Sequence, residues 1–453
     1  MSVKNVQVKP KAEKAEKTEF KKEIDLFGGV SILAGIMIGT GIFLSSGGAL
    51  SAAYSNPLLT VLVWFVAGIV TLLAGLCYGE LGASMPTSGG SYVYLSKAYG
   101  NFVGFLSGLS NFLVGYSGSI AAIAVGFTWF LQFFRPLTTG QEKAIAIGLV
   151  IILTIINCLG VKLGSIFQNI TMIGKLVPII LIILLGVWVN RSGSLFSFAN
   201  IPQNPIGGMS SALILALWGY EGWTNLNNVA EEIKNPRRNI PLCITIAIVG
   251  VTLIYCIFNI ALLKVLPVDV IISSQNPAGE AAQALIGNLG GTIVAIGILI
   301  SILGALNGCI LVFPRNYYAM AQDKVFFRSF GKLHPKFKTP VNALIASAII
   351  SIVLILIGDF NDLATMVVFA AWLFNALTII AVFIFRKKYP DLERPYKVIG
   401  YPVMPILALI SIVLILISTL IEKFRFSMLG LGLTFGVGIP AYFLFKFINK
   451  EKK

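Results

Sequence analysis

The sequence predicts an all-α integral membrane protein with twelve transmembrane helices. Of its 453 residues, 57% are hydrophobic and only 12% are charged, and the mean hydropathy is +0.87. A single water-soluble core could not absorb so many apolar side chains, so lipid must surround much of the chain. Apolar spans follow one another from residue 26 onward, and two of them are interrupted by glycines.

The spans are separated by polar loops, and each is at least as long as a membrane crossing requires, about 17 residues. We place them at 27–50, 57–83, 101–133, 142–160, 165–189, 207–230, 240–266, 285–319, 341–357, 362–385, 402–420 and 427–447. The third and eighth spans exceed what a crossing needs, so we expect them to tilt or to extend beyond the lipid.

The Lys and Arg residues are distributed unevenly between the loops. An even number of spans places both termini on one side of the membrane. With the N-terminus inside, 26 of the 34 basic residues lie in cytoplasmic segments and six lie in external loops. Cytoplasmic loops retain positive charge, so we expect a multi-pass protein of the cell membrane with both termini in the cytoplasm. The net charge of +15 therefore indicates no nucleic-acid partner.

The first span is uncharged but is a poor continuous helix at its centre. Gly35, Gly39 and Gly41 fall within seven residues, and each interior glycine costs about 1 kcal/mol relative to alanine. A helix that breaks in lipid frees backbone N–H and C=O groups, which is tolerated where they line a cavity or meet a ligand. The alternative is that Gly35 and Gly39 form a small-residue packing face for a neighbouring helix.

The sixth span contains a second unusual segment, residues 217–225, with two glycines, two tryptophans and Glu221. A carboxylate in mid-membrane costs about 3 kcal/mol, so it should face the interior of the helix bundle. Interruptions in the first and sixth spans match the inverted five-helix repeats of transporters, whose half-helix ends hold ions and charged substrate groups. A zwitterionic amino acid carries both charges.

Other polar residues carry further expectations. Lys175 lies too deep in the fifth span to reach the cytoplasm easily, so it should have a partner or lose its proton, and we favour a functional role. Glu80 is interpreted as a gate residue or as a hydrogen-bond partner of the loop at 85–94. His334 is the only histidine, and no nucleophile–base pair, phosphate loop or metal cluster is apparent. We therefore expect no enzyme activity, cofactor or metal site.

An ordered series of motifs runs along the chain. They are GTGIF at 39–43, PTSGGSYVY at 86–94, GYEGW at 219–223, EEIKNP at 231–236, LNG at 306–308, PR at 314–315, HPKFKTP at 334–340 and LERP at 392–395. This series resembles the amino acid–polyamine–organocation (APC) superfamily. More narrowly, it is similar to the L-type amino acid transporters and to bacterial serine/threonine exchangers. The resemblance covers nearly the whole chain after residue 22.

The resemblance implies a LeuT-like fold, in which two inverted repeats of five helices precede two extra helices. It implies a substrate site between spans one, three, six, eight and ten. The expected organisation is a disordered cytoplasmic tail (1–25), a transporter core (26–389), helices eleven and twelve (390–448) and a C-terminal cytoplasmic tail (449–453).

The resemblance also implies particular substrate-binding residues. The N–H groups of Thr40, Gly41 and Ile42, with the Thr40 hydroxyl, would hold the substrate carboxylate. The first half-helix would contribute to the ammonium site through carbonyl groups around Met37 and Ile38.

The sixth span supplies the rest of the implied site. Carbonyl groups around Trp218 and Glu221 would complete the ammonium site, and Gly219 is included among the binding residues. Trp218 stands where relatives place an aromatic outer gate. Lys175 matches a lysine whose charge replaces a sodium ion in sodium-independent relatives, with Ser301 as a polar partner.

The function implied is sodium-independent exchange of small neutral L-amino acids (Ser, Thr, Ala or Cys) by alternating access. An antiporter of cationic amino acids or polyamines is the alternative if Glu221 faces the pocket ionised. A proton-coupled amino acid symporter also stays open, and a channel is the remote alternative. Animal relatives use a cysteine between spans three and four to bond a heavy chain. Residues 134–143 contain none, so no disulfide-linked heavy chain is expected.

Overall fold

The computed structural model describes residues 22, 24–189, 206–274 and 276–450. Within these ranges the chain is helical, apart from one backbone bridge between Ile24 and Ile233. The predicted all-α class is therefore confirmed. Most of the two predicted tails, 1–25 and 449–453, and the predicted external loop that contains Arg191 lie outside the described residues.

The first part of the chain forms eight α-helices and one π-helical turn. They are α1 (Leu26–Met37), α2 (Thr40–Ala52), α3 (Pro57–Ser84), α4 (Ser91–Tyr99), α5 (Asn101–Ser110), η1 (Asn111–Gly115), α6 (Tyr116–Leu131), α7 (Thr139–Cys158) and α8 (Val161–Gly186).

The second part, from residue 206, follows with further helices and short turns. They are α9 (Ile206–Tyr220), η2 (Asn225–Glu232), α10 (Pro236–Val265), α11 (Val268–Ser273), α12 (Pro277–Ile286), α13 (Asn288–Val312), α14 (Pro314–Gln322), η3 (Arg328–Gly331), α15 (Val341–Ile357), α16 (Phe360–Lys388), α17 (Val403–Glu422), α18 (Phe424–Leu431), η4 (Gly432–Val437) and α19 (Gly438–Lys450).

The longer helices overlap the predicted spans, whereas α4, α11 and most of α12 lie between them. Among the described residues, eight helices are long and apolar enough to cross a membrane, and the bent pair α1–α2 makes a ninth. The fifth, sixth and ninth predicted spans contain α8, α9 and α15. The two spans predicted to be overlong are 31 and 35 residues in the structure. The described helices thus include at least eight that are long and apolar enough to cross a membrane, while the count of twelve stays a prediction.

Local sequence signals set several helix starts. The Asn56 side chain accepts a hydrogen bond from the backbone N–H of Leu59 and caps α3, whose first residue is a proline. Thr138 and Gln141 form a reciprocal capping box at the start of α7. Such caps satisfy N–H groups that have no partner inside the helix, so the long spans begin where the sequence places these residues.

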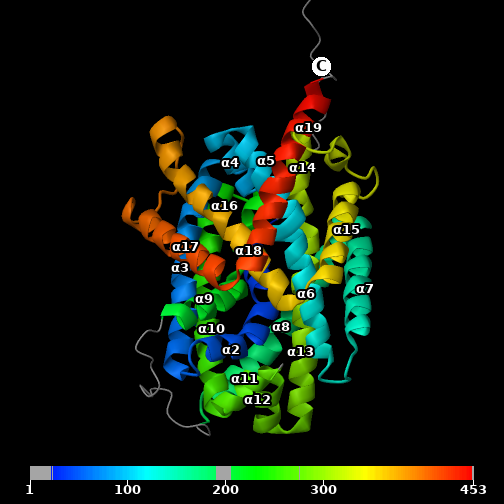
Figure 1. Ribbon diagram of the computed structural model, residues 1–453, viewed down its shortest axis with the longest axis vertical. Coiled ribbons are helices and arrows are strands. Elements are labelled where there is room, and N and C mark those ends of the chain that lie inside the picture. The colour runs from blue at the N-terminus through cyan, green and yellow to red at the C-terminus, as the bar shows by residue number, and fades with distance from the viewer. Residues whose placement is uncertain (1–21, 23, 190–205, 275, 451–453) are drawn as a thin grey trace, which may run out of the picture.

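The molecule has two distinct ends (Figure 1). At one end lie α4, α5, α14 and the C-terminal part of α19, and at the opposite end lie α11 and α12. We call the first the basic end, because the loop at 323–340 there contains five Lys and Arg residues, the loop at 389–402 two and α4 one. The chain just before α1 pairs with the chain after η2: Ile24 N–H donates to Glu232 O (2.9 Å), and Lys234 N–H donates to Ile24 O (2.7 Å).

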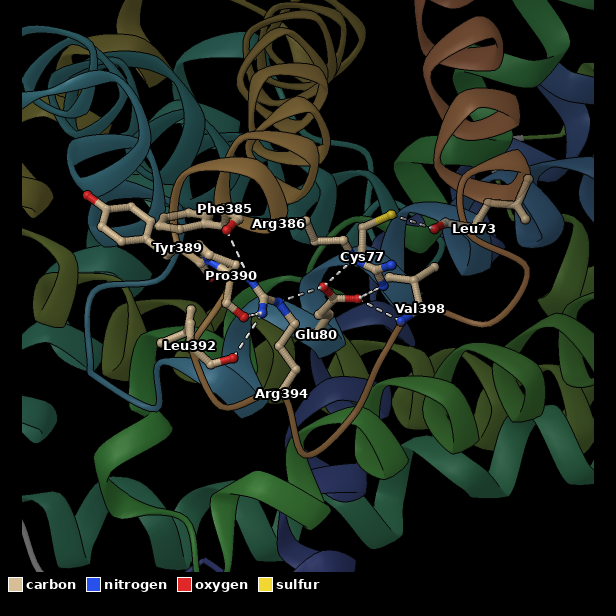
Figure 2. A network of polar contacts seen from close by, with 10 residues as sticks. All are labelled: Leu73, Cys77, Glu80, Phe385, Arg386, Tyr389, Pro390, Leu392, Arg394 and Val398. Carbon is tan, nitrogen blue, oxygen red and sulfur yellow. Dashed lines mark hydrogen bonds and ion pairs between the residues drawn. The ribbon is translucent and has the colours of Figure 1, made fainter.

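A buried ion-pair cluster fixes three segments to one another (Figure 2). The Glu80 carboxylate near the end of α3 accepts hydrogen bonds from Arg386 Nε (2.9 Å) and Nη2 (2.6 Å) on α16. It also accepts one from the backbone N–H of Val398 (2.7 Å) and lies 3.8 Å from Arg394 Nε. The partners of Glu80 are therefore α16 and the following loop. Of the two interpretations of Glu80, the hydrogen bond to the loop at 85–94 is wrong, because these arginines, distant in the sequence, reach the carboxylate. The gate role stays a prediction.

Arg394 extends this cluster to the end of α16. Its guanidinium donates to the carbonyls of Phe385 (2.8 Å) and Tyr389 (2.7 Å). The last carbonyls of a helix have no partner within it, so Arg394 caps α16 while it neutralises Glu80. One carboxylate thus holds both the helix and the loop that leads to α17.

We expect the Glu80→Ala variant to lose about 3–5 kcal/mol of stability, because it leaves two mostly buried arginines without their carboxylate. The measurement is thermal unfolding of the purified protein in detergent. Glu393→Ala is the matched control: it removes the Arg237–Glu393 pair, whose side chains are 58% and 66% exposed, and should change stability by less than about 1 kcal/mol. Equal melting temperatures for the two variants would contradict a structural role for Glu80.

Candidate functional site

The first predicted span is broken in the structure. Helices α1 and α2 are bent by 43° relative to each other, and Ile38 and Gly39 lie between them. The break falls inside the glycine-rich motif. It leaves carbonyl groups at the end of α1 and N–H groups at the start of α2 without partners inside a helix.

The sixth predicted span is also broken. Helix α9 ends at Tyr220, residues 221–224 form a turn, and η2 follows. The Glu221 N–H donates to Trp218 O (3.0 Å) to begin the turn. Gly222 has φ +113°, a left-handed conformation that side chains other than glycine rarely adopt. Glycine is therefore needed for the chain to leave the helix at this point.

The two breaks lie against each other. A Cβ atom added to Gly41 would lie 2.3 Å from Gly219 Cα and 2.9 Å from Gly219 N, so these backbones touch and leave no room for a side chain. The Tyr255 hydroxyl lies 2.7 Å from Met37 O and 2.8 Å from Gly219 O. A single phenol on α10 thus joins both breaks.

Lys175 is fully buried beside the first break. Its Nζ donates to Gly35 O (2.5 Å) and to Ile38 O (3.5 Å), and Ser301 Oγ donates to Ile38 O (3.2 Å). Lys175 and Ser301, the predicted cation-mimic pair, therefore converge on the carbonyl groups freed at the end of α1. The Ile38 carbonyl is engaged by these side chains.

A cavity of about 710 Å³, part of it open to solvent, borders both breaks. Five of the predicted substrate-binding residues line it: Met37, Thr40, Gly41, Trp218 and Glu221. One carboxylate oxygen of Glu221, Oε2, is enclosed and has no hydrogen-bond partner among the described residues.

The other three predicted binding residues do not line the cavity. Ile38 presents its carbonyl to Lys175. Ile42 is fully buried in the apolar core. Gly219 packs between Gly41 and the Trp64 ring. These three residues support the cavity wall from behind, and their contacts with a substrate stay predictions.

The cavity has a closed end and a polar end. At the closed end, Phe360 packs against Trp218 (ring centroids 5.7 Å apart) and Trp129 (5.3 Å). At the other end the lining reaches Ser91 on α4 and Asn111 on η1, toward the basic end (Figure 1). The cavity therefore runs from the level of the breaks toward the basic end.

Several residues of this region were not predicted from the sequence, and two of them are polar residues inside later spans. Tyr255 contacts both breaks, and Asn375 on α16 lines the cavity. Each is a polar residue inside an otherwise apolar predicted span, 240–266 or 362–385. That signal was present, but helical periodicity alone does not show which residues face the cavity.

Two broken helices that meet at one cavity inside a helical membrane protein are typical of transporters. The comparisons with known proteins identify the family: residues 24–427 match the amino acid permease model, and the chain belongs to this family. It is 35% identical to the serine/threonine exchanger SteT of Bacillus subtilis, over 94% of this chain and 98% of that protein.

Mammalian relatives are similar over the same extent of the chain. The chain is 32% identical to the human b(0,+)-type amino acid transporter 1, over 94% of this chain and 88% of that protein. It is 32% identical to the mouse large neutral amino acids transporter small subunit 2, over 94% of this chain and 81% of that protein. The protein is thus a multi-pass membrane amino acid transporter of the APC superfamily and not an enzyme, as the sequence predicts.

We expect Gly41→Ala to abolish most amino acid uptake while the protein still inserts, because the added methyl group would force the two breaks apart. The measurement is uptake per molecule of protein recovered from the membrane. Gly148→Ala on α7 is the control, since its Cβ would meet no atom within 4 Å, and it should transport normally. Normal uptake by Gly41→Ala would show that transport does not require close contact between the two helix breaks.

Proposed function

We propose that this protein exchanges small neutral L-amino acids across the cell membrane by alternating access. The observation that carries the proposal is that N–H groups at the start of one half-helix and carbonyl groups at two breaks border one cavity. An amino acid has a carboxylate for the first kind of group and an ammonium for the second. The relative named a serine/threonine exchanger supports exchange of small substrates.

In this proposal the N–H groups of Thr40, Gly41 and Ile42 hold the substrate carboxylate, and the positive end of the α2 dipole adds to their attraction. Carbonyl groups of Met37 and of the turn at 218–221 hold the ammonium. The Ile38 carbonyl contributes indirectly, because Lys175 and Ser301 already bind it.

Residues beside the same two breaks also serve as the outer gate and replace a coupling ion. Trp218, packed on Phe360, closes the outer side of the cavity, and the polar end opens toward the cytoplasm. Lys175 supplies a fixed charge at the Gly35 and Ile38 carbonyl groups, so transport needs no sodium ion.

The remaining architecture belongs to the same proposal. Twelve helices cross the membrane as two inverted repeats of five and two extra helices, with the core at 26–389, the extra helices at 390–448 and both termini in the cytoplasm. One relative is named a small subunit. Because residues 134–143 contain no cysteine, this chain works without a disulfide-linked heavy chain.

A second candidate function rests on Glu221. Its Oε2 atom has no partner among the described residues, and the residue lines the cavity. An ionised carboxylate there would attract a second positive charge, which favours an antiporter of cationic amino acids or polyamines. A Glu221 that exchanges a proton with the cavity would instead favour proton-coupled symport.

Reconstituted liposomes distinguish these functions. We expect internal serine to accelerate uptake of labelled serine, because an exchanger returns to its outward-facing state with an internal substrate bound. Replacing external sodium with choline should leave the rate of uptake unchanged. Unlabelled serine should compete more strongly than arginine or putrescine. Stronger competition by arginine would establish the cationic alternative, uptake driven by a pH gradient alone would establish symport, and linear flux independent of internal substrate would indicate a channel.

We expect Lys175→Ala to slow exchange at least tenfold while substrate affinity changes less, because the Gly35 and Ile38 carbonyl groups lose the charge that joins α1 to its surroundings. The measurement is the maximal exchange rate beside the apparent affinity for serine. Lys264→Ala is the control: this lysine donates to the Val187 carbonyl, away from the breaks. Sodium-dependent uptake by the wild type, or an unchanged rate in Lys175→Ala, would contradict the role proposed for Lys175.

A further inference from the structure

One wall of the cavity comes from α16. Val367, Ala371, Phe374 and Asn375 line the cavity, and their spacing places them on one face of the helix. Three of these side chains are apolar. Asn375 is therefore the polar group that α16 presents in this wall, and it is 6% exposed.

A buried tyrosine fixes the orientation of the Asn375 amide. The Tyr78 hydroxyl on α3 donates to Asn375 Oδ1 at 2.7 Å. Tyr78 is fully buried, and its ring packs edge-on against Trp223 (centroids 4.9 Å apart) and Tyr94 (6.2 Å). Since Tyr78 holds the amide oxygen from α3, the opposite side of the amide carries Nδ2.

The Nδ2 group of Asn375 is left with unused hydrogen-bonding capacity. A primary amide has two N–H donors, and no described residue accepts a hydrogen bond from this nitrogen. The hydroxyl of Ser119, which also lines the cavity, already donates to Gly115 O (2.8 Å). Asn375 is therefore a fixed residue at the cavity wall with a donor available to an acceptor within the cavity.

We propose that Asn375 determines side-chain specificity by donating a hydrogen bond from Nδ2 to the hydroxyl oxygen of serine or threonine held at the two breaks. Tyr78 is the positioning residue that keeps the amide in this orientation. The inference rests on the proposed function, because it concerns the side chain of the amino acid that the cavity binds. It adds the substrate class, β-hydroxy amino acids.

The physical basis is the free-energy cost of leaving the Asn375 amide donor without a hydrogen-bond partner when the substrate has no hydroxyl. A substrate of equal shape without the hydroxyl would displace water from the amide and leave its donor unsatisfied, which a site built for a hydroxyl penalises. Threonine and valine have nearly the same shape. The wild type should therefore prefer threonine to valine in competition for labelled serine.

The test measures the ratio of apparent affinities for threonine and valine in reconstituted liposomes. Asn375→Leu, of similar size, should lower the preference for threonine about tenfold, the effect of one hydrogen bond, while valine still binds. Asn375→Asp keeps an acceptor for Tyr78 but removes the donor when ionised, and should lower the ratio similarly. Tyr78→Phe should lower it less, since the amide remains but can turn.

Tyr94→Phe is the matched control. It removes a buried tyrosine hydroxyl next to Tyr78 whose partner is Asn227 (3.0 Å) rather than Asn375, so the ratio should not change. Unchanged ratios in Asn375→Leu and Asn375→Asp, or equal losses for threonine and valine, would overturn the inference. Failure of the proposed function is distinguishable, because the wild type would then exchange neither threonine nor valine.

Discussion

The rest of the structure depends on one constraint: backbone groups freed by a helix break inside a membrane must find partners. Lys175 and Ser301 bind carbonyl groups at the end of α1, and Tyr255 lies between carbonyl groups of both breaks. The contact of Gly41 with Gly219 brings the breaks close enough for this. Some of the backbone groups freed at the breaks are therefore bound by side chains of the protein, and others border the cavity.

The two ends of the cavity lie near different kinds of interaction. At one end Phe360 packs edge-on against Trp218, an arrangement that aromatic rings favour and that adds to the stability gained by burying them. Toward the basic end, directional contacts connect distant segments, including the bond between Ile24 and Glu232 and the buried pair of Glu232 with Arg315 (2.7 Å). Directional bonds require particular geometry, so these contacts fix the relative positions of the segments that they join.

The sequence predicted the helical class, the family and the positions of both breaks, because glycines and a carboxylate inside apolar spans conflict with a continuous lipid-facing helix. The depth of Lys175 in its span also predicted that it needs partners. The partners of Glu80 were not predictable, since Arg386 lies 306 residues away. Whether Ile38 or Asn375 faces the cavity depends on helix rotation, which periodicity does not determine.

The meeting of two backbones at the centre of the cavity has a consequence for how such proteins diversify. Mutation exchanges side chains but leaves N–H and C=O groups in place, so a centre built from backbone is inherited unchanged as the surrounding wall varies. In the function proposed above, the invariant part of an amino acid, its carboxylate and ammonium, would bind at this centre, and the variable part would meet lining side chains such as Asn375 and Cys309. New preferences can therefore evolve by single substitutions in the wall, without loss of the ancestral ability to hold an amino acid.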